Sequence, residues 1–544
     1  MEKGRREFLK QAAMASGGAG LMALLPDSLI MAMAIDPAKG STYLDAEHVV
    51  FLMQENRSFD HTFGTLQGVR GFDDPRAIDL PDGRPVWFQQ NASKETYAPF
   101  RLDMHRTRAT WMSSLPHSWP NQVDARNNGW YDKWLISKSS GHEEYKNMPL
   151  TLGYHNREDI PFYYALADAF TVCDHNFCSS LTGTTPNRLF FWSGTIREKE
   201  DATVPARVYN GDADYGNMVN WKTFPERLEA AGIGWKVYQN EISAGTGLQG
   251  EADSWLANFT DNPLEFFEQY NVKLAPEYIA NLPQAAISIR SAIDEKEQQL
   301  LQLKDGTDEK VQAASQLAWL RKALDQNIAD QRECTPDKFN ALPESARAIH
   351  RKAFTNNRKD QDYHTLESFT YKDGTEERSV SIPKGDVLHQ FRDDVSNGNL
   401  PAVSWLVAPE NFSDHPSAAW YGSWYISEVM KILTDNPEVW KKTIFVLTYD
   451  ENDGYFDHLP PFAPPHPQRP DSGKCSAGIT TDTEYVIGKG QQSSEDEDLR
   501  ESPIGLGYRV PMVIASPWTR GGWVNSEVFV HTSSLQFLEK WLSH

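Results

Sequence analysis

Two pairs of adjacent polar residues in this sequence have the chemistry of metal ligands. Glu55 and Asn56 follow one short, continuous apolar run, and Asp450 and Glu451 follow another. Such runs are typical of strands buried on both faces of a parallel sheet, and ligands in open α/β sheets bind beyond the carboxyl ends of the strands. Carboxylate and amide oxygens are hard donors, so the two pairs predict a site for one divalent cation. Taken singly, an acidic residue after a strand is more often a loop residue or a helix cap, and only the matching context of both pairs favours a metal site.

A hydroxyl residue, Thr184, stands at the expected start of a helix. Pro186 follows two residues later, where a helix tolerates proline because the missing N–H would be unpaired in any case. The free N–H groups and the dipole of a helix N-terminus favour a phosphate or an alkoxide. Thr184 is therefore a candidate nucleophile, although this segment alone also allows a simple helix cap. Asn187 and Arg188 come next and are candidate partners for phosphate or for the structure.

Strand-like and helical segments alternate around these residues. The strand-like runs are 48–53, 234–238, 402–407, 443–448 and 510–516, and the helical patterns are 161–170, 223–231, 423–433 and 533–542. This alternation predicts an α/β fold with a three-layer α/β/α core.

Residues 285–330 have a different pattern. Isoleucines and leucines recur at helical spacing in two sets, and Gly306 lies between them. The pattern predicts an antiparallel helical hairpin inserted into the core, either as a packing element or as a lid.

The composition excludes some classes of protein. The chain has 544 residues, with 53 Lys+Arg against 75 Asp+Glu and a formal net charge of −22. This excess of acid argues against a nucleic-acid binder and offers no polybasic attraction to anionic lipid. Four cysteines are too few for a disulfide scaffold at this length.

The N-terminal segment has the features of a targeting signal. Arg5 and Arg6 precede Phe-Leu-Lys and a modestly apolar run, and an Ala-Met-Ala sequence ends at Ala34. We interpret residues 1–34 as a twin-arginine signal peptide, which implies the Tat export machinery as a partner and a periplasmic or secreted product. The alternative is a transmembrane anchor, which is disfavoured because Pro26 interrupts the run.

Several longer segments carry a resemblance to a known family. They are 54–61, 184–188, 408–416, 448–458, 510–523 and 531–533, and they span nearly the whole chain after the signal. In these segments the chain resembles bacterial phospholipases C of the phosphoesterase family, which also contains acid phosphatases and belongs to the alkaline-phosphatase-like superfamily. The resemblance implies an alkaline-phosphatase-like core over residues 35–544.

The resemblance also implies roles for the residues singled out above. Glu55, Asn56, Asp450 and Glu451 would hold one divalent metal ion, and Thr184 would attack phosphorus. The metal would lower the pKa of the hydroxyl and neutralise a phosphate oxygen.

A poor leaving group such as a lipid alkoxide needs a general acid. His117, His415 and His458 lie within matching segments and are the candidates. A lone histidine is otherwise more often a structural hydrogen-bonding group.

Aromatic residues follow two of these histidines closely. The candidates for a choline-binding box are Trp119, Trp130, Tyr131, Trp420 and Tyr421. Aromatic faces attract quaternary ammonium groups, with ordinary core packing as the alternative for any one of them.

Together these features predict an exported phospholipase C. Its substrate would be a phosphatidylcholine-like lipid at a membrane or micelle surface, and its products diacylglycerol and phosphocholine. Two alternatives are an acid phosphatase that acts on phosphomonoesters and a non-catalytic exported protein that binds choline or phospholipid.

Overall fold

The computed structural model describes residues 26–103, 106, 112–373, 375–415, 420–488 and 498–544. The twin-arginine motif and most of the predicted signal peptide lie outside these residues. No helix among the residues described is both long enough and apolar enough to cross a membrane.

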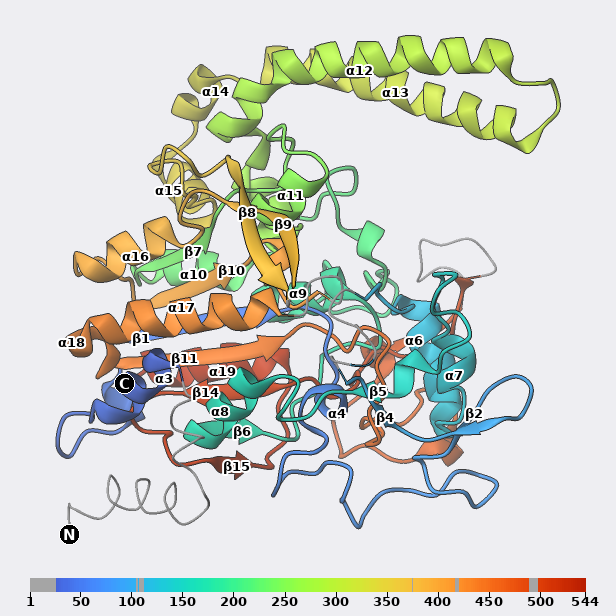
Figure 1. Cartoon of the computed structure of the whole chain (residues 1–544), viewed down its shortest axis with the longest axis vertical. Coiled ribbons are helices and arrows are strands. Elements are labelled where there is room, and N and C mark those ends of the chain that lie inside the picture. The colour runs from blue at the N-terminus through green and yellow to red at the C-terminus, as the bar shows by residue number, and fades with distance from the viewer. Residues whose placement is uncertain (1–25, 104–105, 107–111, 374, 416–419, 489–497) are drawn as a thin grey trace.

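A seven-stranded mixed sheet forms the centre of the molecule (Figure 1). Its order is β15 (Trp523–Asn525), β6 (Thr171–Cys173), β14 (Met512–Ala515), β11 (Thr443–Tyr449), β1 (His48–Gln54), β10 (Val403–Val407) and β7 (Trp235–Gln239). Strand β1 is parallel to both of its neighbours, β10 and β11, whereas β14 runs antiparallel to β11. All five strand-like runs of the sequence are strands of this sheet, so the α/β prediction is confirmed.

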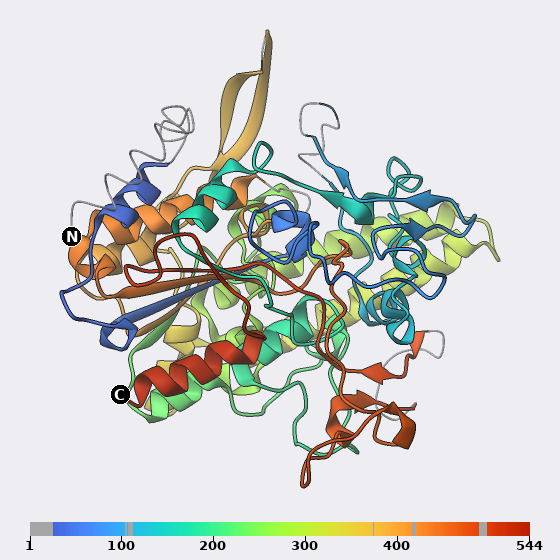
Figure 2. The same cartoon turned by 90° about the horizontal axis from the view of Figure 1, so that it is seen from below.

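Helices cover both faces of the sheet because the side chains of its central strands alternate between two cores. Val49 and Phe51 of β1 belong to one hydrophobic cluster, and Val50 and Leu52 belong to the other. The first cluster includes side chains of α9 (Thr184–Ser193) and α19 (His531–Leu542), and the second includes side chains of α3 (Asp27–Ala34), α8 (Pro161–Ala169) and α17 (Tyr421–Asp435). Figure 2 shows the red α19 on one side of the sheet and the orange α17 on the other.

The remaining elements are short or peripheral. The helices are α4 (Phe59–Phe63), α6 (Trp119–Arg126), α7 (Trp134–Ser137), α10 (Phe224–Ala230), α11 (Glu251–Leu256), α12 (Pro276–Gln302), α13 (Asp308–Glu333), α14 (Pro336–Ala341), α15 (Glu344–Ala353), α16 (His389–Ser396) and α18 (Pro437–Trp440). The two-residue strands are β2 (Gln89–Gln90), β3 (Thr96–Tyr97), β4 (Phe100–Arg101), β5 (Gly153–Tyr154), β12 (Tyr485–Val486) and β13 (Ser502–Pro503). A longer two-stranded ribbon, β8 (Leu366–Asp373) with β9 (Glu376–Pro383), stands out from the body (Figure 2).

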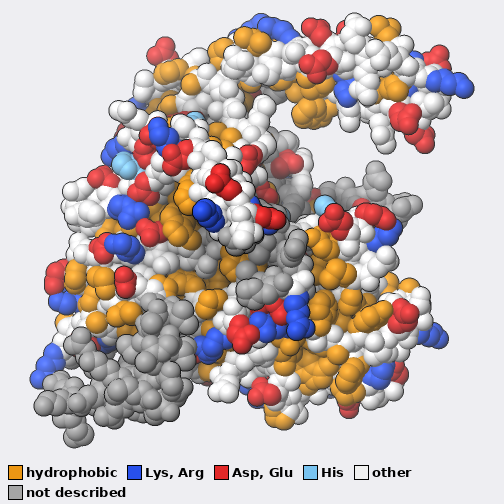
Figure 3. All heavy atoms as spheres, in the orientation of Figure 1, with side chains coloured by type: hydrophobic (Ala, Val, Ile, Leu, Met, Phe, Trp, Pro, Cys, Tyr) orange, Lys and Arg blue, Asp and Glu red, His pale blue; other side chains and the backbone are white. Residues whose placement is uncertain are grey.

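Helices α12 and α13 form an arm that projects from the body (Figure 1). The two helices pack along each other around a short turn that contains Gly306. At the base of the arm, Asp330 accepts hydrogen bonds from Lys273 Nζ at 3.0 Å and from the Tyr278 hydroxyl at 2.5 Å. Figure 3 shows the surface hollowed beneath the arm on this face of the molecule. The arm covers the range in which the sequence predicts a helical hairpin.

Helix α3, at the end of the predicted signal peptide, is packed into the core. Leu29 and Ala32 are fully buried against the cluster that includes α17 and α8. Trp440 Nε1 donates a hydrogen bond of 3.0 Å to the carbonyl oxygen of Ala32. The folded body therefore includes residues that cleavage after Ala34 would remove.

We predict that Leu29→Ala lowers the free energy of unfolding by about 2–5 kcal/mol, because it opens a cavity in a filled core. The matched control on the same helix is Ile30→Ala, which removes a side chain that is 37% exposed and is expected to cost much less. Chemical denaturation of the chain expressed from residue 1 measures both. Equal stabilities of the two variants would contradict the packing of α3.

Candidate functional site

The two predicted ligand pairs lie side by side at the carboxyl ends of β1 and β11. Gln54 and Tyr449, the last residues of these strands, are paired in register. The Asp450 amide donates to the carbonyl oxygen of Gln54 at 3.1 Å, and the Asn56 amide donates to Asp450 Oδ1 at 3.3 Å. The side chains that follow both strands are almost wholly buried. The parallel register therefore brings residues nearly four hundred positions apart into one group.

Asn56 places its side-chain amide between two carboxylates. Its backbone is left-handed, with φ 61°, a conformation that asparagine tolerates better than most residues. One terminal atom of the amide lies 2.7 Å from Glu451 Oε1 and 3.3 Å from Glu55 Oε2. With the nitrogen there, the amide donates to both carboxylates; with the oxygen there, three oxygens converge with no proton between them. The second arrangement is the donor set of a hard divalent cation.

Glu55 supports the same interpretation. Its Oε1 is buried and accepts no hydrogen bond from any residue that the structure describes. Burial, together with the neighbouring carboxylates Asp261 and Asp450, raises the pKa of Glu55 well above its usual range. A buried acid with an unused oxygen needs positive charge beside it. The residues present therefore fit a divalent metal ion.

Asp261 is a functional residue that the sequence analysis missed. One oxygen from each of Glu55, Asp261 and Asp450 lies within 4.8 Å of the others. Two consecutive residues with left-handed backbone, Phe259 (φ 58°) and Thr260 (φ 66°), precede it in an irregular loop. No motif or periodic pattern marks this position, so only the folded loop reveals Asp261 as a further candidate ligand.

Arg188 lies beneath the carboxylates rather than toward substrate. Its guanidinium nitrogens lie 2.9 Å from Asp261 Oδ2, 3.1 Å from Asp450 Oδ2 and 3.6 Å from Glu55 Oε1. The side chain is 2% exposed and also donates to the Asp261 carbonyl oxygen at 3.1 Å. Of the two roles that the sequence leaves open for Arg188, contact with phosphate or with the structure, this placement favours the second. Arg188 compensates the charge of the group.

Asn187 is also a structural support in the folded chain. Its Nδ2 donates to the carbonyl oxygens of Thr182 and Gly183, both at 3.1 Å, and its Oδ1 accepts from the Ser180 amide at 2.8 Å. These bonds use the amide fully and fix the loop that leads into α9. Asn187 is therefore a residue that shapes the loop before Thr184, not one that faces a ligand.

Thr184 is the first residue of α9 and does not cap the helix. The N-cap residue is Gly183, which has no side chain with which to cap the helix. The Thr185 amide instead donates to Asn210 Oδ1 at 3.0 Å. The half-buried Thr184 hydroxyl is thus not needed for the helix start, which leaves it open to the nucleophile role.

His117 lies against the loop that carries Thr184. A Cβ built on Gly183 would lie 3.4 Å from His117 Cδ2, so the two segments are in close contact. Nδ1 of His117 lies 2.6 Å from the Leu115 carbonyl oxygen and 3.1 Å from Asp453 Oδ1, and Nε2 lies 4.0 Å from Glu451 Oε1. Burial opposes the charged form, but Glu451 and Asp453 outweigh it and raise the pKa of His117 to about 10. A raised pKa keeps His117 protonated, which is the state that a general acid requires.

A buried lysine, also missed in the sequence, holds the segment around His117. Lys138 Nζ donates to the Pro116 carbonyl oxygen and to Gln122 Oε1, both at 2.7 Å. Gln122 in turn donates to Asn452 Oδ1 at 2.7 Å. These contacts join the His117 segment to the loop after β11, which carries Glu451.

His415 lies beside the same site but in a different state. Its ring is 5.1 Å from that of Phe259, and its Nδ1 is 3.6 Å from Glu410 Oε1. Burial lowers the pKa of His415 to about 4. As a neutral imidazole it is suited to binding or to accepting a proton, rather than to donating one.

His458 is not part of this group. It is fully buried, and its ion pairs are with Asp60 and Asp74. The predicted role of His458 as a general acid is therefore not supported by its position. Its neighbours form a second cluster that is considered below.

The five aromatic residues proposed as a choline box do not form one enclosure. Trp119 and Tyr131 are fully buried in one core, whereas Trp420 and Tyr421 pack against the core on the other face of the sheet. Trp130 is 58% exposed. Proximity in sequence to a histidine did not determine which face each ring would occupy.

Behind the site, a small enclosed cavity is lined by polar side chains that include Arg57, His155 and Asp414. His155 is 2% exposed and packs edge-on against His61 and Trp420. Burial, aided by the charge of Arg57, lowers the pKa of His155 to about 3.

We predict that His155 makes the fold sensitive to acid. In the unfolded chain, His155 binds a proton below its ordinary pKa of about 6.5. In the folded chain, it binds a proton only near pH 3. The free energy of unfolding therefore falls as the pH falls from about 6.5 to about 3. His155→Phe keeps the edge-on packing and should flatten the dependence by about 1.4 kcal/mol per pH unit. Denaturation curves between pH 7 and pH 5 measure the slope, and the same substitution at the exposed His142 is the control. An unchanged slope in His155→Phe would refute the assignment.

We also predict that Arg188→Met lowers the free energy of unfolding by about 3–5 kcal/mol in chelator, because three buried carboxylates lose their cation. Adding Asp261→Asn to that chain should restore part of the loss, since it removes one uncompensated charge. Arg157→Gln breaks a surface ion pair with Asp168 and is the control, with an expected cost below about 1 kcal/mol. A loss in Arg188→Met no larger than in this control would show that Arg188 does not carry the compensation.

Comparison with known proteins is consistent with this geometry. Residues 46–289 and 345–543 match the Phosphoesterase family. The chain is 37% identical over 547 residues to a non-hemolytic phospholipase C of Burkholderia pseudomallei and 36% identical over 549 residues to a non-hemolytic phospholipase C of Pseudomonas aeruginosa. These alignments cover 98% and 99% of this chain but 60% of each relative, so the chain spans about three fifths of their length. It is also 30% identical to phospholipase C A of Mycobacterium tuberculosis, with 98% of this chain and 80% of that protein covered.

Proposed function

The chain belongs to the Phosphoesterase family, and on that premise we propose that it is a phospholipase C. Its substrates are phosphatidylcholine-like lipids at a membrane or micelle surface, and its products are diacylglycerol and phosphocholine. The printed names of the relatives in three bacteria support the reaction class. The central parallel strands, the helices on both faces and the ligand pairs at two strand ends support an alkaline-phosphatase-like three-layer core.

One observation carries the proposal: Arg188 ties the helix that begins at Thr184 to both ligand pairs. Arg188 lies one helical turn after Thr184, so the two side chains share a face of α9. Because Arg188 contacts Glu55 and Asp450, it turns that face toward the ligand group. This arrangement supports Thr184 as a nucleophile on the face of α9 that is turned to the ligand group.

Glu55, Asn56, Asp450 and Glu451 would hold one divalent cation, with Asp261 as a further candidate ligand. When bound, such an ion lowers the pKa of a nearby hydroxyl and neutralises charge on a phosphate oxygen.

The residues of the chain account for the two chemical steps. Thr184, as the alkoxide, attacks phosphorus in line with the departing glycerol oxygen, which gives a phosphothreonine. The His117 imidazolium gives its proton to that oxygen, so diacylglycerol leaves as an alcohol. Water then attacks the phosphothreonine while neutral His117 takes a proton from the water, which releases phosphocholine and regenerates the Thr184 alkoxide and the His117 imidazolium.

Export by the twin-arginine route is part of the proposal. The paired arginines at positions 5 and 6 support it. The candidate metal site supports it as well, because this route carries folded proteins and so allows a metal ion to be bound before export. Because α3 is packed into the core, cleavage of the chain after Ala34 would expose the apolar surface that this helix covers.

An acid phosphatase acting on phosphomonoesters is the second candidate, because nothing in the nucleophile and ligand arrangement requires a diester. A non-catalytic exported protein that binds choline or phospholipid is less consistent with the site, since the unused Thr184 hydroxyl has no place in simple binding.

The test is the hydrolysis of p-nitrophenyl phosphorylcholine and of p-nitrophenyl phosphate by wild type and by Thr184→Ala. We expect wild type to prefer the choline diester and to lose activity reversibly on chelation. Thr184→Ala should lose roughly 10³-fold or more in kcat, whereas Thr185→Ala, one residue further along the helix, is the matched control.

The outcomes separate the candidates. Preference for the monoester, with the same dependence on Thr184 and metal, would identify a phosphatase. Turnover that persists in Thr184→Ala would overturn the mechanism. Binding without turnover of either substrate, after metal is restored, would leave the non-catalytic alternative.

A further inference from the structure

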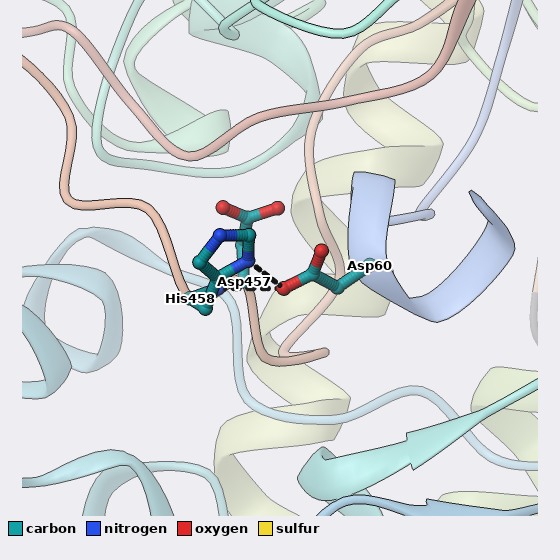
Figure 4. Close-up of side chains that lie close together, drawn as sticks. All are labelled: Asp60, Asp457 and His458. Atoms are coloured by element: carbon teal, nitrogen blue, oxygen red, sulfur yellow. Dashed lines mark hydrogen bonds and ion pairs between the residues drawn. The ribbon is translucent and has the colours of Figure 1, made fainter. Parts of the chain in front are cut away.

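A second buried cluster of metal-type residues lies apart from the candidate catalytic group. It consists of Asp60 on α4 and of Asp457 and His458 in the loop after β11 (Figure 4). One ligand atom from each of the three residues lies within 4.8 Å of the others, and all three side chains are almost wholly buried. Asp74, from the loop after α4, adjoins His458.

Asp60 fixes the orientation and the tautomer of the His458 ring. Asp60 Oδ2 lies 2.6 Å from His458 Nδ1 and accepts the His458 backbone amide at 2.7 Å (Figure 4). Arg509 adds a hydrogen bond of 3.0 Å to the other oxygen of Asp60. Because an ionised carboxylate can only accept, Nδ1 carries a proton, and Nε2 lies on the opposite side of the ring.

Three atoms of the cluster lack a hydrogen-bond partner. His458 Nε2, Asp457 Oδ2 and Asp74 Oδ2 are all buried, and within the described part of the chain none has a hydrogen-bond partner. His458 Nε2 lies 3.7 Å from Asp74 Oδ2. Buried polar atoms are rarely left without partners, so these three atoms favour a bound positive group beside them.

The partners of the remaining oxygens are already in place. Asp457 Oδ1 accepts from Arg509 Nε and from the Leu459 amide, both at 3.0 Å. Asp74 Oδ1 accepts from Arg76 Nε at 2.7 Å. The unused oxygens of these two carboxylates are therefore Asp457 Oδ2 and Asp74 Oδ2.

Carboxylates outnumber arginines in the cluster. Asp60, Asp74 and Asp457 pack beside Arg509, which is buried, and Arg76, whose side chain is 58% exposed. Burial of several neighbouring carboxylates is costly, and a bound cation would offset that cost.

We propose that this cluster is a second divalent-cation site, with His458 Nε2, Asp457 Oδ2 and Asp74 Oδ2 as its ligands. A histidine that donates its other ring nitrogen to a carboxylate, as His458 does to Asp60, is the usual arrangement of a metal-bound imidazole. One nitrogen and two carboxylate oxygens suit Zn²⁺. The first group offers oxygen donors alone and suits a harder cation.

The ion has a structural role that goes beyond the proposed function and does not depend on it. Asp60 follows shortly after Glu55 and Asn56, and His458 closes the loop that begins with Asp450. A cation here joins the segments after β1 and β11 a second time, behind the pairs that form the catalytic group. It therefore fixes the separation of those pairs.

The test counts metal ions in the full chain. Wild type, loaded with Zn²⁺ and freed of excess by gel filtration, should retain about two ions per chain by mass spectrometry of the metal. The double variant Asp450→Asn/Glu451→Gln should retain about one, and adding Asp74→Asn to it should remove that one. Asp74→Asn keeps the shape of the side chain and its Oδ1 contact with Arg76.

A spectroscopic measurement identifies the ligand atom. With Co²⁺ in the Asp450→Asn/Glu451→Gln chain, we expect visible absorption from a cobalt–imidazole site, which His458→Gln should abolish. His350→Gln is the matched control, because His350 is also buried but bonds the Tyr270 carbonyl oxygen far from the cluster. Circular dichroism checks folding, and Asp457→Asn replaces any variant that does not fold.

Two results would overturn the proposal. One is a double variant Asp450→Asn/Glu451→Gln that binds no ion, and the other is an ion count that Asp74→Asn and Asp457→Asn leave unchanged. Either result concerns metal counts alone, so it is distinguishable from a failure of the phospholipase assignment, which is measured by turnover.

Discussion

A single guanidinium, that of Arg188, holds together three buried carboxylates that would otherwise repel one another. Glu55 and Asp450 come from the ends of two strands, Asp261 comes from an irregular loop, and each contacts the same side chain. Because the cation belongs to α9, the compensation of charge also sets where that helix begins. The position of Thr184 relative to the strand ends therefore depends on electrostatics in the core as well as on the loop that Asn187 fixes.

The same constraint explains why the site is only partly neutral. One guanidinium cannot balance the whole group, and His117 and Lys138 contribute positive charge from the other side, near Glu451. Residual negative charge would make the site costly to fold without a cation and would favour binding of one. In the proposed function, affinity for metal and positioning of the nucleophile would thus arise from one imbalance.

Much of this could be predicted from sequence, for a physical reason. The runs 48–53 and 443–448 are continuous and apolar because their strands are buried on both faces. The strands and the polar residues at their ends could therefore be predicted from the sequence. Asp261 could not, because two left-handed residues in a loop direct it, and no pattern encodes that geometry. The structure separates His458 and the five aromatic residues from one another because residue type does not reveal which part of the interior a side chain enters. The sequence left two roles open for Arg188, because a charged residue beside a candidate nucleophile can face outward to phosphate or inward to the structure.

The arm formed by α12 and α13 has a consequence for how the molecule opens. Its helices pack mainly against each other, and Asp330 closes its base through Lys273 and Tyr278. Contacts so local in sequence can separate and re-form without disturbing the sheet. We therefore expect the arm to open locally, at a smaller free-energy cost than the unfolding of the sheet.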